Sequence, residues 1–149
     1  TLSASEAQPR MLRIEWGAPA NSATAGLTGY EVATKLCPPA AACGTATIVP
    51  LASDVLSYEK TPVHPGTQHS FRVRALSGDG TPGGWMPEVK LTALADAPEP
   101  PEPTLSSDDP ACCSVRVEWT APEENGAPIE AYVAHAHDLR IPLEGVPKP

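Results

Sequence analysis

The sequence is poor in aromatic residues, basic clusters and long apolar runs. It has one Phe, three Tyr and three Trp in 149 residues, against 19 Pro. Proline interrupts helices but is tolerated in turns and edge strands, so this composition argues against a helical protein. No apolar run approaches the ~18 residues that cross a bilayer, and no basic-then-apolar leader opens the chain. We expect the chain as given to be soluble, with no membrane insertion in this segment.

The charge balance narrows the classes of partner. The net charge is −8, from 18 acidic and 10 basic residues. An acidic surface repels phosphate backbones, so nucleic acid is not an expected partner. The sequence also lacks an Asn-x-Ser/Thr sequon. Together with charge-rich strands, this favours an intracellular over an extracellular location.

One phrase occurs twice, as Leu12–Pro19 (LRIEWGAP) and as Val115–Pro122 (VRVEWTAP). Each copy is followed by a turn rich in Gly, Ala and Asn and then by a marker tyrosine, Tyr30 in the first copy and Tyr132 in the second. The two phrases are separated by roughly the length of one sandwich domain. Repetition at this spacing indicates two copies of one domain type.

Alternating polarity predicts β-strands. In the first copy the apolar residues Leu12, Ile14 and Trp16 alternate with charged ones, as a half-buried strand requires. Further strands are expected over the ranges Gly29–Lys35, Ala46–Leu51, Val55–Lys60, Ser70–Leu76 and Glu88–Ala93, with a frayed first strand within Thr1–Arg10. Seven short strands separated by turn residues predict a two-sheet sandwich.

The segment Leu94–Pro110 has five acidic residues, five prolines and no base. It has little apolar surface to bury and a restricted backbone, which is typical of a stiff, extended connector. The spacing Pro98 to Pro101 also fits a PxxP ligand, although no arginine flanks it. We therefore predict a domain at 1–93, an acidic Pro-rich linker at 94–103 and the N-terminal part of a second domain at 104–149.

The second copy is the shorter one, because only 17 residues follow Tyr132. We expect the chain to be a piece of a longer protein. The missing strands would follow in the parent sequence or come from a neighbouring chain by strand addition.

These residues resemble the fibronectin type III domain. The motifs that carry the resemblance are Leu12–Pro19, Leu27–Val32, Pro65–Ala75, the glycine loop Ser77–Gly84 and the last strand Trp85–Thr92. They cover essentially all of residues 1–93. The resemblance implies an all-β, seven-stranded, immunoglobulin-like sandwich, followed by a partial second sandwich.

The resemblance also assigns the core. The expected core markers of the two copies are Trp16, Tyr30, Phe71, Trp119 and Tyr132. A true immunoglobulin domain is disfavoured, because its inter-sheet disulfide needs a Cys in the strand around Phe71. The family's tyrosine-corner position holds His69. Its ring can donate to backbone but reaches less far than a phenol, which implies a looser corner.

The four cysteines leave two alternatives. Cys37 and Cys43 flank Pro-Pro-Ala-Ala-Ala, so a small bridge is geometrically feasible in an oxidising compartment. By strand parity, Cys113 points inward and Cys112 outward. We favour four reduced thiols, consistent with an intracellular location. A zinc site needs closer ligand pairs, so we expect no metal there.

Several other short motifs match a functional pattern, but the residues around them do not support that function. Gly78–Gly83 fits GxGxxG, but it contains a proline and precedes a strand instead of a helix. The same loop lacks the arginine of an Arg-Gly-Asp site. His135 and His137 have metal-sharing spacing without a third ligand. No nucleophile motif or paired carboxylate is present, so we expect no enzyme activity and no cofactor.

We interpret the chain as a non-catalytic structural or protein-interaction module of a larger multidomain scaffold, with other proteins as partners. The phrase Trp119–Ile129 resembles titin-like members of the family, which favours a cytoskeletal or axonemal (cilium) assembly. The alternatives are an extracellular adhesion or receptor spacer and an accessory domain of a secreted hydrolase. The outward-facing Arg13, Arg72 and Arg74 form the candidate interaction surface.

Overall fold

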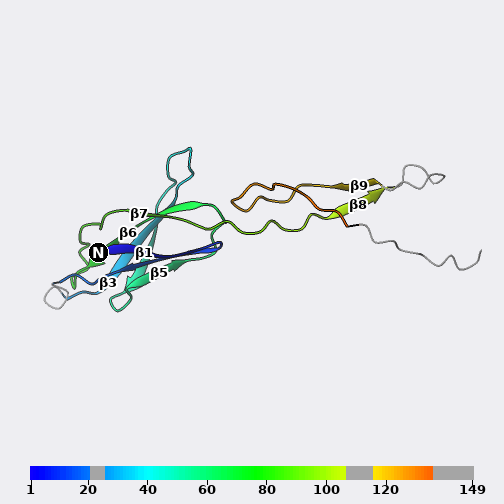
Figure 1. The fold of residues 1–149 in the computed structure, drawn as a ribbon. Coiled ribbons are helices and arrows are strands. Elements are labelled where there is room, and N and C mark those ends of the chain that lie inside the picture. Colours follow the sequence, from blue (N-terminus) through cyan, green and yellow to red (C-terminus); the bar gives the residue numbers. More distant parts are fainter. Residues whose placement is uncertain (21–25, 107–115, 136–149) are drawn as a thin grey trace, which may run out of the picture.

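The computed structural model describes residues 1–20, 26–106 and 116–135. In these ranges the chain forms antiparallel β-strands and no helix (Figure 1). The all-β class is therefore confirmed. The described ranges also contain no helix able to span a membrane.

The first sheet has three strands in the order β1-β2-β5. They are β1 (Leu2–Gln8), β2 (Met11–Trp16) and β5 (Ser57–Lys60). The first strand is not frayed, because it pairs with β2 from Leu2 to Gln8, with a bulge between Ala4 and Glu6. Bulges of this kind are typical of sheet edges, where they increase the local twist.

The second sheet has four strands in the order β4-β3-β6-β7. They are β3 (Gly29–Leu36), β4 (Thr47–Ala52), β6 (Gln68–Leu76) and β7 (Val89–Thr92). Pro50 lies within β4, an edge strand, where a missing backbone donor is tolerated. The last strand is shorter than the family pattern predicts and leaves Trp85 in the preceding loop.

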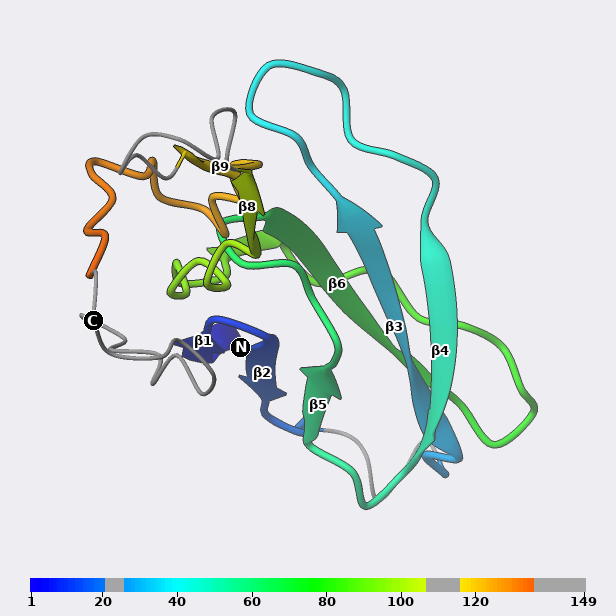
Figure 2. The ribbon, with the colours of Figure 1, turned by 90° about the vertical axis from the view of Figure 1, so that its right-hand side faces the viewer.

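The two sheets face each other and enclose one core (Figure 2). Leu12, Ile14 and Trp16 of β2 are buried against residues of β3 and β6. The rings of Trp16 and Tyr30 meet edge to face at 5.5 Å, a preferred aromatic geometry. A fully buried Leu or Ile side chain, such as Leu12 or Ile14, contributes about 1.5 to 3 kcal/mol. The sandwich predicted from strand alternation is confirmed.

The second repeat contributes a separate, two-stranded sheet of β8 (Pro103–Ser106) and β9 (Arg116–Trp119). The rings of Trp119 and Tyr132 lie 5.5 Å apart, yet these side chains are 40% and 42% exposed. Among the described residues no second sheet covers these two rings, and their role as core markers of the second repeat stays a prediction. Val115, Cys112, Cys113 and His137 lie outside the described residues.

Candidate interaction surface

The outer face of the four-stranded sheet carries two arginines. Strand alternation in β6 turns Phe71 and Val73 into the core and Arg72 and Arg74 away from it. Arg74 lies opposite Glu31 of β3, and its Nη2 is 2.6 Å from Glu31 Oε2. Both side chains are less than a quarter exposed. Arg74 is thus held within the sheet surface and is not free for a partner.

Trp85 covers these arginines from the loop before β7. Its ring centre lies 4.3 Å from the Arg74 guanidinium carbon and 5.9 Å from that of Arg72. The next residue anchors the loop, because the Met86 N–H donates to the Val73 carbonyl at 2.8 Å. Arginine stacked on indole gains a cation–π attraction. Arg72, which is exposed, remains accessible beside the ring.

Arg13 belongs to the other sheet. It lies on β2, where Nη2 is 3.1 Å from Glu15 and Nη1 is 3.3 Å from Glu59. The structure brings Arg72 and Arg74 together on one face but does not bring Arg13 to them. The three candidate residues therefore do not form one continuous patch.

Sequence reasoning missed the partners of Arg74. An outward Glu31 and an outward Arg74 follow from strand alternation, but alternation does not say which strands are neighbours. Their pairing needs the β3–β6 register, which joins residues 43 positions apart. The only signal for Trp85 was its place after the glycine loop, where the family pattern starts a strand.

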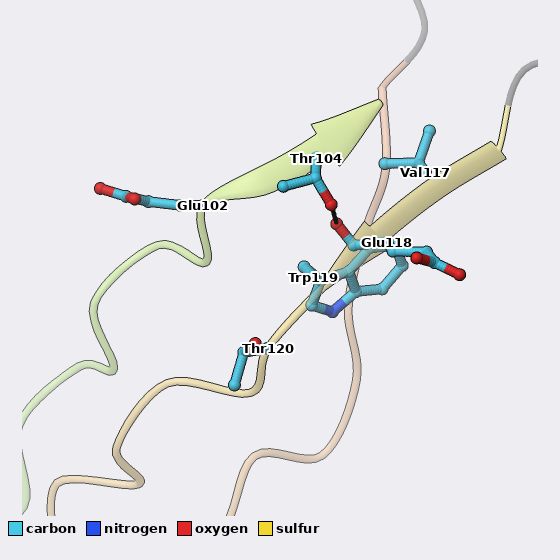
Figure 3. A pocket seen from close by; sticks show the side chains of 6 residues that line it. All are labelled: Glu102, Thr104, Val117, Glu118, Trp119 and Thr120. Atoms are coloured by element: carbon cyan, nitrogen blue, oxygen red, sulfur yellow. Dashed lines mark hydrogen bonds between the residues drawn. The ribbon is translucent and has the colours of Figure 1, made fainter. Parts of the chain in front are cut away.

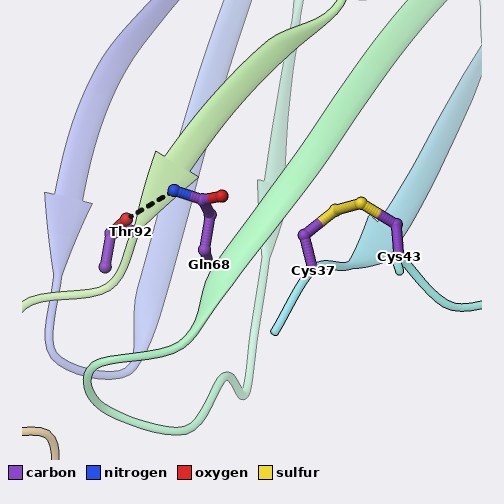
Figure 4. The surroundings of a disulfide bond; sticks show 4 residues. All are labelled: Cys37, Cys43, Gln68 and Thr92. Carbon is purple, nitrogen blue, oxygen red and sulfur yellow. Dashed lines mark hydrogen bonds between the residues drawn. A yellow bond between two sulfur atoms is a disulfide. The ribbon is translucent and has the colours of Figure 1, made fainter. Parts of the chain in front are cut away.

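Cys37 and Cys43 are joined by a disulfide between β3 and β4 (Figure 4). This finding differs from the favoured expectation of four reduced thiols. Backbone bonds hold the two ends of the loop together. The Cys37 N–H donates to the Gln68 carbonyl, and the Gly44 N–H donates to the Leu36 carbonyl, each at 2.8 Å. The strand end thereby places the two cysteines within bonding reach.

His69, at the position of the family's tyrosine corner, is the second residue of β6 and is 7% exposed. Its Nε2 lies 3.4 Å from the Thr67 hydroxyl, which itself donates to the His64 carbonyl at 2.6 Å. Nδ1 has no hydrogen-bond partner in the part of the chain that the structure describes. Among the described residues, the hydrogen-bond partner of the ring is thus a side chain and not a backbone group. Burial lowers the pKa of His69, and the positive charge of Lys60 lowers it further.

The loop between β6 and β7 is closed by Asp79. The Ser77 hydroxyl and the Thr81 N–H both donate to Asp79 Oδ1, the latter at 2.9 Å. These hydrogen bonds, led by that of Ser77, lower the pKa of Asp79 to about 2. The carboxylate is used within its own turn. Gly80 has a φ of +81° here, a conformation that favours glycine.

Two of the hollows in the described part of the chain lie outside the core. The larger, of about 600 Å³, lies on the β8–β9 sheet, where the Thr104 hydroxyl donates to the Glu118 carbonyl at 3.1 Å (Figure 3). The smaller, of about 370 Å³, lies beside the β6–β7 loop. Within the described ranges, no group of three or more His, Cys, Asp or Glu could hold a metal ion. His135 lies outside any strand.

Comparison with known proteins gives related sequences and folds, although no family model matches the chain. Rat usherin is 29% identical over 132 residues, covering 88% of this chain and 2% of usherin. Mouse protein sidekick-2 is 25% identical over 135 residues, covering 90% of this chain and 6% of sidekick-2. The chain thus spans a very small part of either protein's length.

Solved structures agree on the architecture. The third fibronectin III domain of human KIAA0343 protein matches with a TM-score of 0.54 at 15% identity, covering 67% of this chain and 84% of that domain. Identity at this level supports the fold and nothing finer. The chain therefore has the fold of the fibronectin type III domain, as its repeated sequence motifs predict.

Proposed function

We propose that this chain is a non-catalytic protein-interaction module of a larger multidomain protein. The sandwich packs apolar residues of β2, β3 and β6 into one core and presents paired charges outside, which suits docking and spacing better than chemistry. The much greater lengths of usherin and sidekick-2 support a place in a longer protein.

We further infer that the module works in an oxidising compartment, as an adhesion or receptor spacer. The observation that carries this inference is the Cys37–Cys43 disulfide. Structural disulfides form and persist in secreted and cell-surface proteins and are rare in the cytosol.

A cytoskeletal or axonemal scaffold of a cilium is the second candidate. It is favoured by the net charge of −8 and by the missing Asn-x-Ser/Thr sequon. In this setting Cys37 and Cys43 would be reduced.

The two candidates are separated by the thiol state of the protein isolated from its source. N-ethylmaleimide is added at lysis, before any reductant, and the protein is digested with trypsin. Both cysteines fall in one peptide, residues 36–60. The first candidate predicts that this peptide takes up no label until it is reduced. Two labels before reduction would overturn it and favour the second candidate. A sample labelled after reduction is the matched control.

The docking surface is the part of the outer sheet face around Arg72. Arg72 is exposed, whereas Arg74 is paired with Glu31 and covered by Trp85. A guanidinium beside an indole fits a protein partner that offers a carboxylate and an apolar side chain.

A further inference from the structure

Two glycines make a backbone contact between the first seven strands and the second repeat. After β9 the chain runs back toward the sandwich (Figure 1), and Gly126 meets Gly66, which lies between β5 and β6. A Cβ on Gly126 would lie 2.6 Å from Gly66 Cα and 2.7 Å from Gly66 N, and a Cβ on Gly66 would overlap Gly126 Cα. No side chain fits at either position.

The turn that carries Gly126 is preformed for this contact. Asn125 and Gly126 have φ values of +48° and +90°, and the Ala127 N–H donates to the Glu124 carbonyl at 3.1 Å. Asn-Gly is the sequence most suited to a tight turn with two positive φ angles. The turn therefore presents a bare backbone at Gly126 and a carboxamide at Asn125.

The segment after β7 accepts this turn on one side. The Asp96 N–H donates to the Asn125 carbonyl at 3.0 Å, and Asn125 Nδ2 donates to the Ala97 carbonyl at 2.9 Å. These two bonds join residues that are 28 or 29 positions apart. They leave the turn no freedom to slide along the segment while both are made.

The same segment is tied to the sandwich on its other side. Asp96 Oδ2 is 3.1 Å from Arg10 Nε. The Leu94 N–H donates to the Gln8 carbonyl at 3.3 Å, and the Gly66 N–H donates to the Ala93 carbonyl at 3.1 Å. Asp96 thus binds the turn between β1 and β2 through its carboxylate and the second repeat through its amide.

We propose that Gly66, Asp96, Asn125 and Gly126 form an interdomain joint that holds the two repeats in one orientation. The surface is the Gly66 corner, and the partner it fits is an Asn-Gly turn of the following repeat. Because the contact is made by backbone groups and one carboxamide, it recognises the shape of the turn. The joint concerns how consecutive repeats are connected, whatever protein the module binds.

Hydrogen exchange and NMR on the full chain test the joint. In the unsubstituted chain we expect an NOE between the α-protons of Gly66 and Gly126 and a protected Asp96 amide. Gly126→Ala and Gly66→Ala should each speed Asp96 exchange about tenfold or more, because the joint opens locally. The Met86 amide, bonded to Val73 within the sandwich, should keep its rate and report that the domain is folded.

Gly80→Ala is the matched control. Gly80 also has a positive φ, +81°, but no atom lies within 4 Å of the point that a Cβ would occupy, so alanine adds the same backbone strain without a contact. This variant should leave Asp96 exchange unchanged. Asn125→Asp is a further test variant and not a control. It keeps a residue that tolerates this turn and removes the donor to the Ala97 carbonyl, so Asp96 exchange should become faster. Equal Asp96 exchange in all four variants, or the absence of the Gly66–Gly126 NOE, would overturn the joint.

Discussion

Trp85 lies over the guanidinium of Arg74 with its ring centre 4.3 Å from the charged carbon. Replacing Trp85 with Ala exposes the Arg74–Glu31 pair to water and removes the cation–π contact, so we expect the free energy of unfolding to fall by about 1 to 2 kcal/mol. Urea denaturation measures the change. Arg72→Glu, at an exposed site, should change stability by less than about 0.5 kcal/mol. An equal loss in both variants would contradict the assigned roles.

Tyr30 predicts a substitution that stabilises the protein. Its side chain is fully buried, and its hydroxyl has no hydrogen-bond partner among the described residues. Burial accordingly raises the pKa of this phenol. Tyr30→Phe removes an unsatisfied polar group without removing the ring, so we expect the free energy of unfolding to rise by about 1 kcal/mol. Thermal denaturation followed by circular dichroism checks it; a destabilised variant would mean that the hydroxyl has a partner.

His69 predicts a loss of stability on acidification. Burial places its pKa below the usual value of 6.5 in the folded state. Below pH 6.5 the unfolded chain therefore binds a proton that the folded chain does not. The contribution of neutral His69 to the free energy of unfolding is complete above pH 6.5. It is lost as the pH falls from 6.5 through the lower pKa of the folded state. In His69→Phe this component of the pH dependence should disappear, as measured by urea midpoints from neutral pH down to about pH 5. An unchanged slope would show that other groups cause it.

The two repeated tryptophans should differ in their effect. Trp16 is 5% exposed and Trp119 is 40% exposed. Trp16→Ala should therefore cost about 3 to 5 kcal/mol and unfold the first seven strands, as large-to-small core substitutions do. Trp119→Ala should leave the melting temperature of those strands near its original value. Differential scanning calorimetry on both variants distinguishes the two, and similar shifts would count against this difference in burial.

The alternation of apolar and charged residues was sufficient to predict the strands of the sandwich. Alternation in Leu12, Ile14 and Trp16 located β2, and the same reasoning placed most of the other strands within one or two residues. The signal is strong there because one face of each strand must be apolar and the other charged.

Contacts between distant segments were not predictable. The pairing of Arg74 with Glu31 depends on strand order, and the contact of Gly66 with Gly126 depends on how one repeat follows another. Neither leaves a periodic trace in the sequence. The disulfide is feasible from the spacing of its cysteines but is not favoured by the sequence, because charge and the missing sequon point to a reducing compartment. The hydrogen bonds that close the loop at Cys37 cannot be predicted from the charge or from the missing sequon.

Pro50 has a consequence for the behaviour of many copies held close together. The edge of β4 would otherwise offer a regular row of donors and acceptors to the strand of another molecule. Proline supplies no N–H, so an incoming strand cannot build an unbroken ladder along this edge. Where many similar sandwiches lie close together, the local concentration of such edges is high. Pro50 then makes edge-to-edge pairing of β4 with a strand of a neighbouring unit less favourable.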